Sequence, residues 1–306
     1  MAEQKLKHHL IYYPSMVLIG FLSLLPYRWM GFLGRTFGLL VFKFAKKERE
    51  KTTVNIRIAF SQTMTWNQAE NLARRVWIGV GWNLFEVARW ISMNREEIVS
   101  RVVRVQGWEN MESALSRQKG VIILSGHLGN WELMGAYLAW KTPTAAVAQK
   151  LYDPRFDELV TWMRENVMKI PMIKRGLALR GILEALRKNN AVIALADQDT
   201  GNDGVFVPFF GKPAWTQSGV ARIVYKTGAA LVPVFGVRGT DGKFELHVGK
   251  EIEIQRTTDA EKDILRIVQR YTEVIEAYVK SYPDQWMWMH ERWKTKPTTA
   301  EKASLS

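Results

Sequence analysis

A chain of 306 residues without a single cysteine can form no disulfide, no cysteine-ligated zinc site and no cysteine nucleophile. Three sequence motifs are missing as well: a G-x-S-x-G elbow, a G-x4-G-K-[ST] loop, and a G-x-G-x-x-G turn after an apolar strand. The five histidines do not fall into a spacing typical of metal ligands. These absences count against serine hydrolases, P-loop NTPases and nicotinamide enzymes, and they leave no predicted metal site.

Positive charge is what the chain has in excess, since 43 Lys and Arg against 30 Asp and Glu give a net charge of +13. Residues 1–60 contribute +7 of it, from ten Lys or Arg and three Glu. Within them, residues 10–27 carry no charged side chain, and an 18-residue run is about the shortest that spans a bilayer. A basic cluster follows at residues 43–57. One marginal span, two helices lying in the membrane interface, and a buried helical hairpin all remain open, and the pattern favours membrane association of residues 1–60.

The rest of the chain alternates short apolar runs with amphipathic stretches, which predicts strands alternating with helices. We expect strands at 120–125, 145–149, 191–196, 230–237 and 243–254, and helices at 65–92, 130–140, 154–167, 177–188 and 260–282. This order predicts an α/β fold with a mostly parallel central sheet flanked by helices on both faces, preceded by the apolar helical segment. Residues 61–294 would form one catalytic domain, and residues 295–306 a frayed tail.

A histidine and a carboxylate stand directly after the first expected strand, in Ser125-Gly-His-Leu-Gly-Asn-Trp-Glu132. Ligands of parallel α/β sheets bind at the carboxyl ends of the strands, which is where His127 would lie. A carboxylate such as Glu132, if it held one ring N–H, would fix the tautomer and leave the other nitrogen as a general base near neutral pH. The spacing therefore indicates a His–acid pair that activates a hydroxyl of the substrate. The alternative is a structural histidine at a strand end.

Several blocks in order resemble one enzyme family. His127–Glu132 resembles the H-x4-[DE] box of the glycerolipid acyltransferase superfamily, and in particular of the bacterial late acyltransferases of lipid A biosynthesis. Further blocks of this chain that resemble the family lie at 55–60, 151–157 with Arg164, 196–199, 209–216 and 283–294. The resemblance extends from about residue 10 to residue 294.

The resemblance implies transfer of a fatty acyl chain from an acyl carrier protein thioester to a hydroxyl of an acyl chain on a phosphorylated lipid A precursor. His127 would take the hydroxyl proton, and Glu132 would hold the imidazole. No cofactor, metal or covalent enzyme intermediate is expected, because thiolate is already a good leaving group. The implied partners are the carrier protein, the phosphorylated lipid and an anionic membrane surface, with no nucleic acid. The implied location is the inner membrane, with the catalytic domain on the cytoplasmic side.

Four further residues are candidates for substrate binding. Arg164 suits a phosphate, since guanidinium groups bind such anions with two parallel hydrogen bonds. Asp197 and Asp199, at the end of an expected strand, would bind sugar hydroxyls or fix an arginine, with helix capping as the alternative. Asn130, inside the histidine box, is the fourth. Donors for the oxyanion are expected in the glycine turn or at the start of the next helix.

Three other functions remain open. The first is an acyltransferase that acts on another glycolipid or an aminolipid. The second is a basic nucleic-acid-binding protein, for which the net charge is the only support. The third is a thioester hydrolase, because water can replace the acceptor hydroxyl at a His–acid site.

Overall fold

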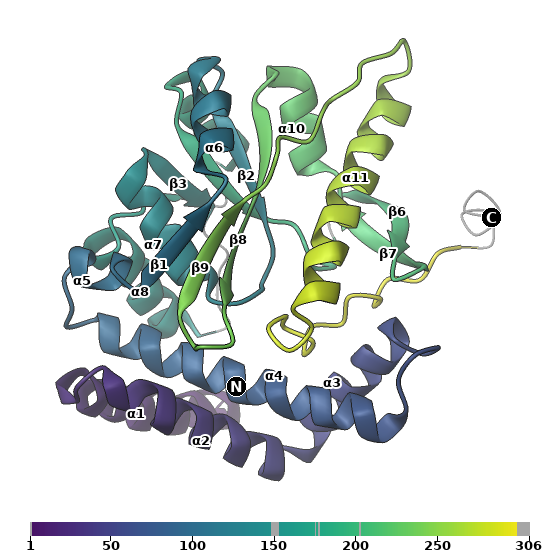
Figure 1. The fold of residues 1–306 in the computed structure, drawn as a ribbon. Helices are drawn as coiled ribbons and strands as arrows, with labels where there is room; N and C mark the ends of the chain where they lie inside the picture. The colour runs from purple at the N-terminus through teal and green to yellow at the C-terminus, as the bar shows by residue number, and fades with distance from the viewer. Residues whose placement is uncertain (1, 148–152, 175, 177, 202, 299–306) are drawn as a thin grey trace.

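A layer of four helices precedes the sheet in the computed structural model, which describes residues 2–147, 153–174, 176, 178–201 and 203–298. The four are α1 (Ala2–Leu24), α2 (Arg28–Phe44), α3 (Lys46–Ala59) and α4 (Trp66–Trp90). Together they lie across one end of the sheet domain (Figure 1). The predicted boundary at residue 60 falls inside this layer, because α4 packs on α2 and α3.

The start of α4 and its contact with α2 both follow from the local sequence. Thr65 caps α4 by accepting from the Gln68 backbone N–H, and the Gln68 side chain accepts from the Thr65 N–H. Further along, α2 and α4 touch at their backbones. A Cβ atom on Gly38 would lie 2.1 Å from the Trp77 carbonyl oxygen, and one on Gly34 would lie 2.6 Å from the Gly81 oxygen. Glycine at these positions therefore fixes the spacing of the two helices.

Seven strands form the main sheet, in the order β1-β9-β8-β2-β5-β3-β4. Their bounds in that order are Val102–Gln106, Phe244–Val248, Ala230–Arg238, Val121–Ser125, Ala191–Leu195, Thr144–Val147 and Met172–Ile173. All neighbouring pairs are parallel except β8 and β9. The predicted α/β class with a mostly parallel sheet is therefore confirmed. The expected strand at 243–254 was too long, since β9 ends at Val248, and residues 148–149 of another expected strand lie outside the described residues.

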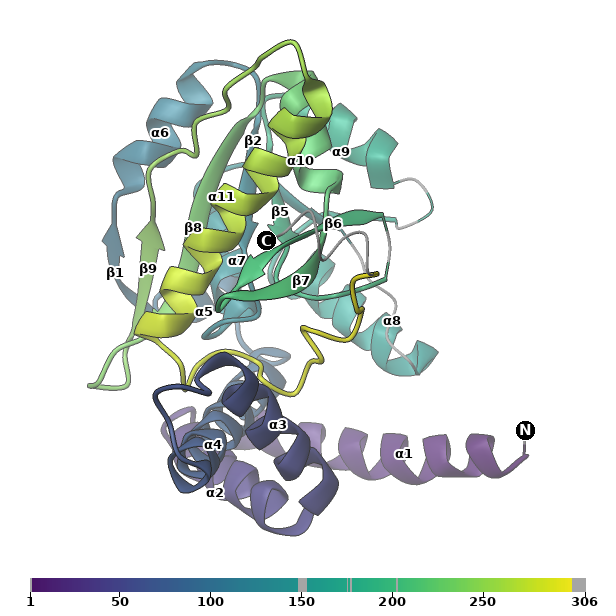
Figure 2. The ribbon, with the colours of Figure 1, turned by 90° about the vertical axis from the view of Figure 1, so that its right-hand side faces the viewer.

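Both faces of this sheet are buried. Along β2, Val121 and Ile123 join one core cluster, whereas Ile122 and Leu124 join the other. On the first side the cluster includes residues of α5 (Arg95–Val99), α6 (Trp108–Ser116), α7 (Trp131–Lys141) and the π-helical turn η1 (Met163–Val167). On the second side it includes residues of α9 (Ala178–Arg187), α10 (Gly219–Thr227) and α11 (Ala260–Ser281). A separate hairpin of β6 (Gly204–Phe209) and β7 (Lys212–Gln217), which the sequence did not predict, lies beside α11 (Figure 2).

The first two helices expose apolar side chains. On α1, which extends beyond the rest of the layer in Figure 2, Leu18 is exposed, and the exposed residues Tyr13, Val17, Phe21 and Leu24 recur every three or four positions and therefore share one face. On α2 the exposed large apolar side chains are those of Trp29, Phe32, Leu40 and Phe44. A buried hairpin would not leave such a face exposed. Among the described residues, no helix combines the length and the apolar character needed to cross a membrane.

Candidate active site

The sheet brings His127 and Asp197 together. Strands β2 and β5 are neighbours in parallel register, with Ser125 opposite Leu195, so both strands end at the same level. His127 follows β2 by two residues and Asp197 follows β5 by two residues. The backbone N–H of His127 donates to Oδ2 of Asp197 at 2.7 Å, and Nδ1 of its ring lies 2.8 Å from Oδ1. Two residues that are 70 positions apart in sequence thus form one pair.

This contact decides the chemistry of the histidine ring. A neutral imidazole that donates from Nδ1 to a carboxylate has an unprotonated Nε2, which can accept a proton from a substrate. The Gln198 side-chain nitrogen lies 3.1 Å from Nδ1 as well, but of the two neighbours only the Asp197 carboxylate can accept the Nδ1 proton. The His127 side chain is 20% exposed, so a substrate hydroxyl can reach it. The edge of the Trp131 indole packs against the ring, with 5.1 Å between centroids.

Asp197 is a buried carboxylate with three N–H donors. Besides the two from His127, the Trp286 indole donates to Oδ2 at 2.7 Å. Burial alone would raise the pKa of Asp197, but the His127 ring, the His127 backbone N–H and the Trp286 indole hold it at about 2. The group is therefore ionised at neutral pH. Since its folded-state pKa lies below the usual 3.8, ionised Asp197 stabilises the fold above that pH and loses this effect as the pH falls toward 2.

The segment after α11 closes the turn that carries His127. Trp286 forms a short antiparallel bridge with Leu128, in which Gly129 N–H donates to the Gln285 carbonyl and Met287 N–H donates to the His127 carbonyl. Gly129 has a φ of +62°, and a Cβ atom there would lie 1.9 Å from the Gly236 carbonyl oxygen. This close approach requires glycine at position 129.

Glu132 does not hold the histidine ring, contrary to the prediction. In the first turn of α7, its carboxylate instead forms a two-point ion pair with Arg164, whose Nε lies 3.0 Å from Oε2 and whose Nη2 reaches Oε1. Spacing along the chain placed Glu132 next to His127, but helix α7 directs its side chain toward η1, and Asp197 occupies the position beside the ring.

Arg164 is therefore partly engaged before any substrate binds. It lies in η1, the π-helical turn that continues α8 (Pro154–Trp162), and irregular turns of this kind are frequent at functional sites. Burial would lower the pKa of Arg164, but the Glu132 carboxylate raises it overall. Nη1 of Arg164 has no hydrogen-bond partner among the described residues, so this nitrogen can still donate to a ligand.

The two remaining candidates have roles within the fold. Asn130 caps α7 by accepting from the Leu133 N–H at 3.0 Å, while its Nδ2 lies 3.4 Å from Glu86. Asp199 accepts from the backbone N–H of Thr295 at 2.8 Å and from its hydroxyl at 3.1 Å. Thr295 is thus held in place although the sequence predicted a frayed tail from this residue; residues 299–306 lie outside the described part of the chain.

His290 is a site neighbour that was not among the candidates proposed from the sequence. Its ring centroid lies 5.7 Å from that of His127. Burial lowers the pKa of His290, and the nearby His127 lowers it further. Spacing gave no signal for His290 or Trp286. The signal that does exist is the terminal block at 283–294, whose resemblance to the family includes both residues.

Comparison with known proteins places the chain in a family. The family model described as bacterial lipid A biosynthesis acyltransferase matches residues 1–295. The chain belongs to the bacterial lipid A biosynthesis acyltransferase family. It is an acyltransferase, as the names of its relatives also state.

The names of individual relatives of this acyltransferase state different acceptors. It is 28% identical to the lipid A biosynthesis lauroyltransferase of Escherichia coli K12 over 94% of both chains. It is 29% identical to the lipid A biosynthesis palmitoleoyltransferase of the same strain, over 89% of this chain and 87% of the relative. It is also 25% identical to a phosphatidylinositol mannoside acyltransferase of Mycobacterium tuberculosis, over 72% of this chain and 69% of the relative.

A cleft of about 930 Å³ opens beside the turn that carries His127. It lies between α2 and α4 on one side and the β8–β9 turn and residues 281–287 on the other. Gly129 and Trp131, which lie within the histidine box, are among its lining residues. The cleft therefore leads from the helical layer toward His127.

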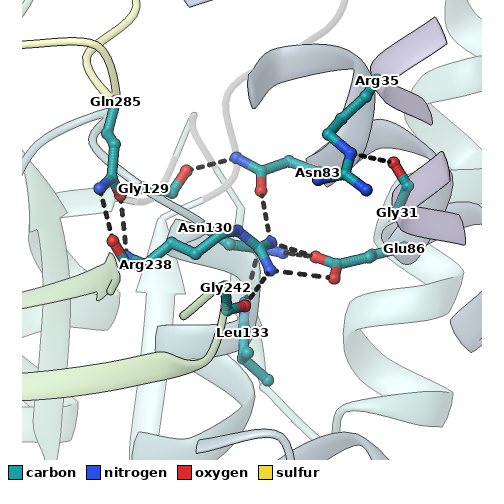
Figure 3. Close-up of polar contacts among 10 residues, drawn as sticks. All are labelled: Gly31, Arg35, Asn83, Glu86, Gly129, Asn130, Leu133, Arg238, Gly242 and Gln285. Carbon is teal, nitrogen blue, oxygen red and sulfur yellow. Dashed lines mark hydrogen bonds and ion pairs between the residues drawn. The ribbon is translucent and has the colours of Figure 1, made fainter. Parts of the chain in front are cut away.

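Arg238, which lines this cleft, forms a buried ion pair with Glu86 (Figure 3). Arg238, at the end of β8, donates to both carboxylate oxygens of Glu86 on α4 and to the Asn83 side-chain oxygen at 3.1 Å. Asn83 in turn donates to the Gly129 carbonyl at 2.6 Å. Gln285 exchanges two hydrogen bonds with the Arg238 backbone, at 2.7 and 2.8 Å. This network connects the helical layer, the sheet and the terminal segment to the turn that carries His127.

Proposed function

We propose that this acyltransferase moves a fatty acyl chain from an acyl carrier protein thioester to a hydroxyl of an acyl chain on a phosphorylated lipid A precursor. The family, and the lipid A acyltransferase names of two relatives, support the acceptor. The observation that carries the chemistry is the 2.8 Å contact between Nδ1 of His127 and Asp197, because it leaves Nε2 unprotonated and able to act as a base.

The mechanism needs one base and no enzyme nucleophile. Nε2 of His127 takes the proton of the acceptor hydroxyl as the hydroxyl oxygen attacks the thioester carbonyl. The tetrahedral intermediate collapses, its C–S bond breaks, and the imidazolium returns the proton to the departing thiolate. Asp197 stabilises the charged ring in between. The products are an ester on the acceptor and the free thiol of the carrier protein.

Donors for the oxyanion come from the start of α7 in this proposal. The backbone N–H groups of His127, Leu128 and Gly129 already donate to Asp197 and to the Gly126 and Gln285 carbonyls, so these three do not face an oxyanion. The first N–H groups of a helix have no partner within the helix, and the helix dipole favours negative charge there. Among the described residues, none accepts from the N–H groups of Trp131 and Glu132.

We further propose that α1 and α2 lie in the interface of the inner membrane, with the catalytic domain on the cytoplasmic side. The apolar faces described above support this, as do the exposed basic residues at the end of α2 and the start of α3, namely Lys43, Lys46 and Lys47. Apolar helix faces bordered by lysines bind anionic bilayers through burial of apolar surface and through attraction of the lysines to lipid phosphates. An acidic carrier protein would approach from the same aqueous side.

A second acceptor class is supported by one relative. The phosphatidylinositol mannoside acyltransferase acts, by its name, on a different phosphorylated glycolipid. The acceptor of this chain would then be another glycolipid with a sugar and a phosphate, while His127 and Asp197 would keep the same roles.

Mass spectrometry of the reaction products tests the proposal directly. Purified enzyme in detergent, with acyl carrier protein thioester and the phosphorylated lipid A precursor, should add one acyl mass to the precursor. Phosphatidylinositol mannoside is the comparison acceptor, and acylation of it alone would favour the second class. Thioester cleavage at the same rate with and without acceptor would instead identify a hydrolase.

The Glu132–Arg164 pair is expected to act as one unit in positioning the substrate. Glu132→Gln, Arg164→Gln and the double variant should each lower kcat/KM by about a hundredfold, because loss of either partner releases the other from its fixed position. Steady-state kinetics with varied donor and acceptor measure this. Losses that multiply in the double variant would contradict a shared role. The exposed pair of Lys188 and Glu184 is the control, and Lys188→Gln should change kcat/KM less than about twofold.

A further inference from the structure

Arg35 projects from α2 toward the cleft beside the catalytic turn. Its Nε donates to the Gly31 carbonyl at 2.8 Å (Figure 3), and its guanidinium lies 4.7 Å from the centroid of the Trp82 ring. The guanidinium of Arg238 lies 3.8 Å from the same ring, so Trp82 contacts both arginines. The backbone contact of α2 with α4 at Gly34 fixes the spacing of these groups. Arg35 is therefore held in position before a ligand arrives.

The charges around the cleft leave Arg35 without an acidic partner. Glu86, which does not line the cleft, pairs with Arg238, and Asp241, which does line it, lies 3.8 Å from Lys243. The other two acidic residues that line the cleft also lie near arginines. Glu245 lies 3.5 Å from Arg104, and Asp284 lies 4.0 Å from Arg75. Within the described residues no carboxylate lies within ion-pair distance of Arg35, and both of its Nη groups are available to donate.

Arg75 is the second cation at the cleft. Its side chain is 57% exposed, and its 4.0 Å contact with Asp284 is long for an ion pair and exposed to water. Such pairs contribute little to stability, so a doubly charged anion can take the guanidinium from the aspartate. Arg35 and Arg75 come from the two packed helices α2 and α4 and both line the cleft.

The position of the cleft relates it to the lipid substrate. Arg35 is three residues from Phe32 on α2, whose side chain is 58% exposed, so one helix presents both an apolar surface and the arginine. Lipid phosphates lie at the depth where interfacial helices place their basic residues. At the other end of the cleft, Trp131 packs against the His127 ring.

We infer that this cleft binds the phosphorylated headgroup of the acceptor lipid, with Arg35 as the principal phosphate ligand and Arg75 as the second. This inference rests on the proposed acyl transfer to a phosphorylated lipid. The headgroup occupies the cleft while the acyl chain that carries the reacting hydroxyl extends past Trp131 to His127. Guanidinium groups suit this task because they bind phosphate with two parallel hydrogen bonds.

The test compares one acceptor with and without its phosphate. Transfer is measured with the phosphorylated lipid A precursor and with the same precursor after phosphatase treatment, at saturating acyl carrier protein thioester. Arg35→Gln should raise KM for the phosphorylated acceptor about tenfold, the effect of one lost charge-assisted hydrogen bond. On the phosphatase-treated acceptor the same variant and the unaltered enzyme should differ by less than about twofold. Arg75→Gln should show the same pattern with a smaller effect.

Arg74→Gln is the matched control, because Arg74 is exposed on α4 next to Arg75 but does not line the cleft. An equal rise in KM for Arg74→Gln, or an equal effect of Arg35→Gln on both acceptors, would overturn the inference. So would a rise in KM for the carrier protein thioester in place of the acceptor, which would assign the arginines to the phosphate of the donor's prosthetic group.

Binding of the same two precursors, followed by tryptophan fluorescence, separates this inference from the proposed function. Phosphate-dependent binding that Arg35→Gln weakens, without any acyl transfer by the unaltered enzyme, would contradict the function and support the headgroup site. Acyl transfer whose KM and binding do not depend on Arg35 would contradict the headgroup site alone.

Discussion

Replacement of His127 by alanine is expected to lower kcat for acyl transfer by about ten-thousandfold, the upper range for loss of a general base. The contact with Asp197 at Nδ1 leaves Nε2 of this ring unprotonated, so Nε2 is the base. The methyl group of alanine cannot accept the hydroxyl proton. The measurement is single-turnover transfer from labelled acyl carrier protein thioester to the phosphorylated precursor. Thermal unfolding should remain cooperative, because the ring is at the edge of the core and partly exposed.

Two other histidines provide the comparison. His290→Gln removes the ring beside His127 and should cost less than about tenfold, because that ring makes no side-chain hydrogen bond within the described residues. His247→Gln, on β9 against Tyr278 and Tyr282, should leave kcat within about twofold of the unaltered enzyme. If His127→Ala retained a tenth of the activity, or if His290→Gln lost as much as His127→Ala, the base would be misassigned.

The sequence could identify His127 because its position depends on local features. A β-branched apolar run predicts β2, and the glycines after it predict a sharp turn, so the strand end and its histidine follow from about ten consecutive residues. The class of the fold follows in the same way, from the alternation of strands and helices along the chain. Neither inference requires knowing which strands are neighbours.

The carboxylate that faces the ring could not be identified in this way. Glu132 is the nearest acid in sequence, but the decisive fact is that β5 lies next to β2, which places Asp197 opposite His127. Strand order depends on long-range packing that local patterns do not encode. The same applies to Trp286, which reaches Asp197 from the far end of the chain. For such residues only the family resemblance supplied a signal.

The cleft is a similar case. Arg238 looks like one basic residue among many in the sequence, yet its pairing with Glu86 neutralises it and leaves Arg35 as the group available to an anion. The net charge of the chain predicts the sign of the partner's charge but not the place where the partner binds. That place depends on which cations already have carboxylate partners.

Asp197→Asn is the second substitution with a large expected effect, a loss of up to about ten-thousandfold in kcat, by analogy with the loss of the orienting aspartate in serine protease triads. In the native pair, Oδ2 of Asp197 accepts from the His127 backbone and from the Trp286 indole. An asparagine has one oxygen, and these two donors would hold it. Its amide nitrogen would then face Nδ1 of His127 and donate to it.

A ring that accepts at Nδ1 carries its proton on Nε2, where it blocks the base. Nitrogen NMR of labelled histidine reports this tautomer directly, so the variant should show both low activity and a proton moved from Nδ1 to Nε2. Raising the pH should not restore activity, because the neutral ring keeps the wrong tautomer. The comparison is Asp199→Asn, at the same strand end but hydrogen-bonded to Thr295, which should cost less than about tenfold and leave the tautomer unchanged. Activity of Asp197→Asn within tenfold of the unaltered enzyme, with the proton still on Nδ1, would show that the carboxylate does not set the state of the base.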